Sequence, residues 1–117
     1  IKINNQQKTV TAVCADVFDL LREYEQTGKT FDMIILDPPA FTKSAKMVQK
    51  AYGGYKEINL RALKILKPGG ILVTCSCSHF FDTNTFYSMI QNAAEDAHKT
   101  IQILEIRPIL SWRQGIN

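Results

Sequence analysis

The chain has 117 residues and a formal net charge of +3, with 45% hydrophobic and 21% charged residues. This length and balance are typical of one small soluble globular domain, and the apolar runs are too short to span a bilayer. No secretory signal pattern is present at the N-terminus, and three cysteines do not suit a disulfide scaffold. We therefore expect a single domain over residues 1–117, located in the cytoplasm without membrane association.

In chain order, the first predicted element is a strand over residues 9–14, where β-branched residues alternate with others. Asp16 follows as a predicted helix N-cap, and Gly28 is the predicted stop of that helix. An apolar strand over residues 31–36 then ends at Asp37-Pro38-Pro39, because two prolines end sheet pairing abruptly. The chain must therefore leave the sheet at Asp37.

The middle of the chain begins with a polar segment over residues 43–52, predicted as a loop or a loose helix that Gly53-Gly54 breaks. A well-formed helix is predicted over residues 55–66, where apolar residues recur at helical spacing. Lys67-Pro68-Gly69-Gly70 predicts a helix stop and a turn. The strand predicted over residues 71–76 begins with an unbroken apolar run, which suits burial on both faces.

Asp82 is predicted to cap a further helix, and residues 101–106 are predicted to form a fourth strand. Strands that alternate with helices indicate parallel pairing with right-handed crossovers. The predicted fold class is therefore α/β, with a doubly wound, mostly parallel sheet and flanking helices.

Cys77 comes at or just past the end of the third predicted strand, next to the strand that precedes Asp37. Ligands bind beyond the carboxyl ends of parallel strands, so we expect Asp37 and Cys77 to face one crevice. An ionised thiol is nucleophilic, although the usual fate of a free cysteine is a small core residue. We expect the core role for Cys75, which lies deeper in the strand, and a functional role for Cys77, which has polar neighbours.

A metal site is the competing chemistry for these cysteines. Cys75, Cys77 and His79 alternate along a strand, and Cys14 is a candidate fourth ligand. Structural zinc sites have two to four residues between the cysteines of a pair, often with a second such pair. The chain lacks that spacing, so we expect no metal.

Other candidate residues have two interpretations each. Asp16 caps a helix, and it also lies at the rim of the predicted sheet, where a carboxylate can accept a hydrogen bond from an adenine amino group. Phe41 is placed either to stack on a base or to pin its loop to the core. Residues 43–67 contain seven basic residues and one acid, so their formal net charge is +6, whereas that of the remaining residues is −3. This cluster of positive charge fits either phosphate contact or a solvated helix face.

Several motifs together resemble a known family. Asp37-Pro38-Pro39 after an apolar strand resembles the fourth motif of class I S-adenosylmethionine-dependent methyltransferases, and residues 14–18, with Asp16, resemble their third motif. Residues 54–59, Pro68-Gly69-Gly70 and Ser76-Cys77-Ser78 extend the likeness to large-subunit ribosomal RNA cytosine-5 methyltransferases of the RlmI type. The resemblance covers residues from about 10 to 108.

The resemblance implies a mechanism and a set of site residues. Cys77 would be the nucleophile that adds to C6 of a cytosine, and Asp37 would bind the base. S-adenosylmethionine would be the cofactor, with Asp16, Asp37 and Pro38 lining its site. The substrate would be RNA, in particular ribosomal RNA, contacted by three residues of the following loop: Pro39, Phe41 and Lys43.

The chain also departs from that family. The glycine-rich turn that holds the cofactor is absent before residue 9, and the family's strand order 3-2-1-4-5-7-6 would be represented by strands 3, 4, 5 and 6 only. We therefore expect a C-terminal piece of a catalytic domain that by itself does not bind S-adenosylmethionine appreciably. Its open sheet edges would favour a homodimer.

Two other functions fit the same residues. A methyltransferase acting on a base nitrogen would use the acid–Pro–Pro motif and leave Cys77 with a structural role. A non-catalytic α/β module would bind RNA through the basic stretch, with the salt sensitivity typical of phosphate contacts.

Overall fold

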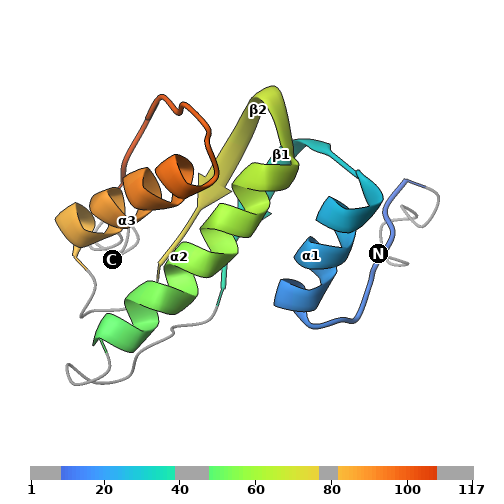
Figure 1. Cartoon of the computed structure of the whole chain (residues 1–117), viewed down its shortest axis with the longest axis horizontal. Coiled ribbons are helices and arrows are strands. Elements are labelled where there is room, and N and C mark those ends of the chain that lie inside the picture. Colours follow the sequence, from blue (N-terminus) through green and yellow to red (C-terminus); the bar gives the residue numbers. More distant parts are fainter. Residues whose placement is uncertain (1–8, 39–47, 77–81, 108–117) are drawn as a thin grey trace, which may run out of the picture.

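Figure 1 shows a computed structural model that describes residues 9–38, 48–76 and 82–107. The elements in order are α1 (Val17–Thr27), β1 (Phe31–Leu36), α2 (Val48–Ile65), β2 (Leu66–Thr74) and α3 (Thr83–Asp96). β1 and β2 pair in parallel, and α2 connects them. The predicted α/β class and the parallel pairing are confirmed.

The helix ends follow the predicted capping residues. Asp16 precedes α1, and its Oδ1 accepts a hydrogen bond from the backbone N–H of Asp19 at 3.2 Å. Gly28 ends α1 with a φ of 77°, a left-handed conformation that glycine adopts without a Cβ clash. Asp82 caps α3 in the same way as Asp16 caps α1, at 2.7 Å from the N–H of Thr85.

The predicted break at Gly53-Gly54 is wrong, because α2 runs through both glycines without interruption. Two glycines cost a helix roughly 2 kcal/mol relative to alanines. The side chains on either side of them offset that cost, since Ala51 and Tyr55 are both buried against Met89 and Ile90 of α3. Tertiary packing therefore keeps α2 helical at Gly53-Gly54, although the local helix propensity is low.

The predicted turn at residues 67–70 lies within β2. Phe31 is paired with Leu66 and Met33 with Ile71, so the intervening β2 residues form an irregularity opposite Asp32. Gly69 has a φ of 81°, and a Cβ on Gly70 would lie 2.8 Å from the Lys67 carbonyl oxygen. The helix stop was predicted correctly, but the strand begins five residues earlier than expected.

The predicted strands over residues 9–14 and 101–106 are wrong, because neither segment has strand structure. A strand forms only where a neighbour takes its backbone hydrogen bonds. Among the described residues the sheet contains β1 and β2 alone. Val13 and Leu104 accordingly remain exposed.

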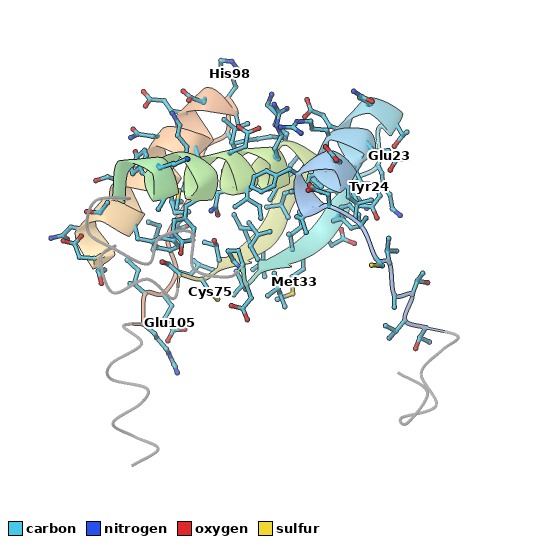
Figure 2. The ribbon with its side chains drawn as sticks, turned by 90° about the horizontal axis from the view of Figure 1, so that it is seen from below. Glu23, Tyr24, Met33, Cys75, His98 and Glu105 are labelled. Carbon is cyan, nitrogen blue, oxygen red and sulfur yellow. The ribbon has the colours of Figure 1, made fainter. Side chains whose placement is uncertain are left out.

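The three helices cover one face of the two strands (Figure 2), and α2 lies between α1 and α3. Ile34 and Leu36 of β1, with Leu72 of β2, pack against buried helix residues. The residues that alternate with them face the other way and are exposed: Met33, Ile35, Ile71 and Val73. The described sheet therefore has one packed face and one bare apolar face.

Candidate functional site

The carboxyl ends of β1 and β2 lie side by side. Leu36 is the register partner of Thr74, and the N–H of Cys75 donates to the Leu36 carbonyl at 3.0 Å. The pairing therefore continues one residue past β2. Asp37 and Pro38 leave β1 next to Cys75 and Ser76, which confirms the predicted adjacency of these two strands.

Asp37 and Pro38 are the two residues of the acid–Pro–Pro motif that the structure describes. The side chain of Asp37 is exposed, and Pro38 is half-buried. Pro39, Phe41, Lys43 and Cys77 lie outside the described residues, so their assigned roles stay predictions.

Cys75 is half-buried and follows β2 on the face that the helices leave bare (Figure 2). The expectation that it is a core residue is not met. The reason is that no helix of the described segments covers that face of the sheet. Cys14 is exposed, in a segment without strand structure.

Asp16 is the N-cap residue of α1. The first turn of α1 lies on the side of the molecule where β1 and β2 end (Figure 1). Asp16 Oδ1 is used by the helix cap. Within the described residues its Oδ2 makes no hydrogen bond, so the capping role leaves one carboxylate oxygen available. The capping prediction is confirmed, and the ligand contact stays a prediction.

The basic stretch is largely neutralised by acids of neighbouring elements. The described cations of this stretch are Lys50, Lys56, Arg61, Lys64 and Lys67. Four of them make ion pairs: Lys56 with Asp96 at 2.7 Å, Arg61 with Glu57 and Glu25 at 3.0 and 3.2 Å, Lys64 with Glu25 and Lys67 with Asp32.

These contacts influence protonation as well as packing. The hydrogen bond to Asp96 raises the pKa of Lys56, and the hydrogen bond to Glu57 raises the pKa of Arg61. Arg61 and Lys64 bridge α2 to Glu25 of α1. For Lys56, Arg61 and Lys64 the structure favours a role in helix packing over phosphate contact. Lys67 instead links β2 to Asp32 of β1, and Lys50 makes no ion pair within the described segments.

Two side chains with a buried oxygen atom were not among the residues predicted from the sequence. Among the described residues, the side-chain oxygens of Asn59 in α2 and Thr74 in β2 are buried and have no hydrogen-bond partner. The sequence signal for Asn59 is a single amide in an otherwise apolar helix face. Thr74 gave no signal, because threonine is common in strands.

Two further properties concern the described residues as a group. Among them, no group of three or more histidine, cysteine, aspartate or glutamate side chains has an arrangement that could bind a metal ion. None of the described helices is both long and apolar enough to cross a membrane.

The parallel βαβ unit, with an acid and a proline after its first strand, defines the chain as part of an α/β fold. Sheets of this class commonly bind ligands beyond the carboxyl ends of their strands. No family model matches the chain. It is 50% identical over 93 residues to the ribosomal RNA large subunit methyltransferase I of Photobacterium profundum, covering 80% of the chain and 23% of that protein.

Proteins of the same name from two other organisms give similar figures. The Aliivibrio fischeri protein is 50% identical over 91 residues, or 78% of the chain. The Cronobacter sakazakii protein is 47% identical over 90 residues, or 77% of the chain. The name agrees with the large-subunit ribosomal RNA methyltransferases that the motifs resemble, so the resemblance is confirmed over the matched residues. The chain spans about a quarter of the length of these curated relatives, 23% in each case.

Proposed function

We propose that this chain is the C-terminal part of a catalytic domain that methylates C5 of a cytosine in large-subunit ribosomal RNA, in the cytoplasm. The relatives named as large-subunit ribosomal RNA methyltransferases support the RNA substrate. The observation that carries the proposal is the pairing of Leu36 with Thr74, continued by the 3.0 Å hydrogen bond from Cys75 to Leu36.

That pairing supports the proposal that Asp37 and Cys77 act at the same edge of the sheet. Asp37 follows directly after β1, and Cys77 is covalently linked to Ser76, whose neighbour Cys75 is hydrogen-bonded to β1. Successive Cα atoms are about 3.8 Å apart, so the proposal assigns Cys77 to the chain segment that follows Ser76, beside the end of β1. A base extruded from its stack can reach both groups.

The proposed chemistry follows from the reactivity of cytosine. The thiolate of Cys77 adds to C6 and forms an S–C6 bond, which makes C5 nucleophilic. After C5 has gained the methyl group, loss of the C5 proton and cleavage of the S–C6 bond restore the aromatic ring. Asp37 accepts a hydrogen bond from the exocyclic amine and orients the base.

S-adenosylmethionine would supply the electrophilic methyl group. The chain's own contribution is Asp16, whose Oδ2 can accept a hydrogen bond from the adenine amino group while Oδ1 keeps the helix cap. Asp37 and Pro38 would line the same site, and Pro39, Phe41 and Lys43 would contact the RNA. The isolated 117-residue chain should not bind the cofactor appreciably, because it lacks the family's glycine-rich turn.

The test uses the full-length protein with its RNA, whose methylated product is digested to nucleosides. We expect 5-methylcytidine from the wild type and from Cys75→Ala, and no methylated nucleoside from Cys77→Ala. Cys75→Ala is the matched control, because it removes a thiol only two residues away. A nucleoside methylated on nitrogen, with an active Cys77→Ala variant, would instead support the alternative in which Cys77 is structural.

A further inference from the structure

Two buried side-chain oxygens, Asn59 Oδ1 of α2 and Thr74 Oγ1 of β2, have no hydrogen-bond partner within the segments that the structure describes. Asn59 is only 1% exposed. Its Nδ2 donates to the Tyr55 carbonyl at 2.8 Å, and because a carbonyl accepts only from the amide's N–H₂ group, the other atom must be the oxygen. A buried acceptor without a donor is costly, so it requires an explanation.

The fold brings these two residues to the same level. Ile58 of α2 belongs to the same buried cluster as Leu36, and Leu36 is the register partner of Thr74. Asn59 directly follows Ile58. It therefore lies at the level of the Leu36–Thr74 pair along the sheet.

The two residues also lie on facing sides of α2 and β2. Leu63, one helical turn after Asn59, is in a buried cluster against which Leu72 packs. Leu72 and Thr74 share the helix-facing side of β2, because alternate strand residues point the same way. Thr74 lies two residues after Leu72, about 6.7 Å further along the same side of β2. Asn59 lies one turn before Leu63 on the same side of α2.

We propose that Asn59 and Thr74 are positioning residues joined by one buried water, which accepts from the Thr74 hydroxyl and donates to Asn59 Oδ1. Neither oxygen bonds the other directly, and a buried water needs at least two polar partners. The link fixes the end of β2 against α2, three residues before Cys77. This role rests on the proposed function, since it matters to catalysis only if Cys77 attacks the base.

Kinetics of the full-length enzyme test the link. Thr74→Val keeps the shape and removes the hydroxyl, and we expect kcat to fall about tenfold with both KM values unchanged, because misplacement of a nucleophile slows chemistry more than binding. Thr74→Ser should restore kcat. Asn59→Leu should also lower kcat, and adding Thr74→Val to it should cause no further loss. The exposed Thr83 supplies the matched control, and Thr83→Val should match the wild type.

Two kinetic results would overturn the proposal. One is Thr74→Val with wild-type kcat and a raised melting temperature, which would mean that the oxygens have no partner at all. The other is an equal loss in Thr74→Ser and Thr74→Val, which would mean a packing role alone. A crystal structure of the full-length protein adds an independent check, since it should contain one water within hydrogen-bond distance of both oxygens, and a dry gap would contradict the link.

These outcomes differ from a failure of the proposed function. If Cys77→Ala retains full activity, the nucleophile assignment is wrong whatever Thr74→Val does. If Cys77→Ala is inactive while Thr74→Val behaves like the wild type, the positioning role alone is wrong.

Discussion

Asp16 combines a structural and a proposed functional role that two substitutions can separate. Asparagine caps helices about as well as aspartate, whereas alanine costs about 1 kcal/mol. We expect Asp16→Asn to keep the melting temperature of the full-length protein and Asp16→Ala to lower it. Both should raise the KM for S-adenosylmethionine about tenfold, because each removes the carboxylate acceptor. An unchanged KM in both variants would restrict Asp16 to capping.

Asp82 provides a pH-dependent contribution to the stability of α3. The hydrogen bond from the Thr85 N–H lowers the pKa of Asp82. The stabilisation is therefore complete above the unfolded pKa of aspartate, about 3.9, and is lost as the pH falls through the lower folded pKa.

The corresponding prediction compares the wild type with Asp82→Asn, which keeps an acceptor without the charge. The stability advantage of the wild type should be present at pH 6 and should disappear toward pH 2, measured by urea unfolding at each pH. The same advantage at both pH values would show that the charge of Asp82 makes no contribution.

At the scale of the elements, α2 contains a glycine whose replacement by alanine should stabilise the helix. Gly53 is exposed in the helix interior, and a Cβ built there meets no atom within 4 Å. Gly53→Ala should therefore raise the free energy of unfolding by about 0.5–1 kcal/mol, measured by denaturant titration. Gly28→Ala is the control that should destabilise, because Gly28 has a φ of 77°. A destabilised Gly53→Ala variant would contradict an unbroken α2.

Some features of the elements depend only on the local sequence, whereas others depend on packing against other elements. The caps at Asp16 and Asp82 and the stop at Gly28 were predictable, since each depends on one side chain and the adjacent backbone. The continuity of α2 was not, because it depends on Tyr55 packing against α3. The segments at residues 9–14 and 101–106 have strand-like sequences, but the described residues provide no strand beside them.

Within the part of the chain that the structure describes, the sheet has one bare apolar face and an unpaired edge on β1. Ile35 of β1 is 64% exposed in the middle of that face, and a groove of about 260 Å³ runs between α1 and β1. Large exposed apolar patches promote association, and two identical β1 edges can pair around a two-fold axis. We propose that the isolated chain forms a homodimer through these surfaces.

Sedimentation of the isolated 117-residue chain tests this association. We expect a concentration-dependent dimer for the wild type and a monomer for Ile35→Lys, because the lysine would bury a charge at the interface. Lys50→Glu, on the helix side of the molecule, serves as the control that should leave the dimer intact. A wild type that stays monomeric at high concentration would contradict the proposal.

The candidate site was predictable to the extent that it depends on strand order. Because β1 and β2 follow one another through a single helix, the sequence was enough to bring Asp37 and the segment leading to Cys77 to one edge. The ion pairs of Arg61 and Lys64 with Glu25 were not predictable, since they depend on the packing of α1 against α2. The buried oxygens of Asn59 and Thr74 required the register of β2 as well.

The central claim is that Cys77 forms a bond to C6 of the target cytosine. The most direct measurement incubates the full-length protein with S-adenosylmethionine and RNA containing 5-fluorocytidine, whose fluorine prevents release of the enzyme, and then maps the adduct by peptide mass spectrometry. The account predicts a nucleotide attached to the peptide at Cys77, present in Cys75→Ala and absent in Cys77→Ala. Methylated RNA without any adduct, or an adduct at Cys75, would contradict it.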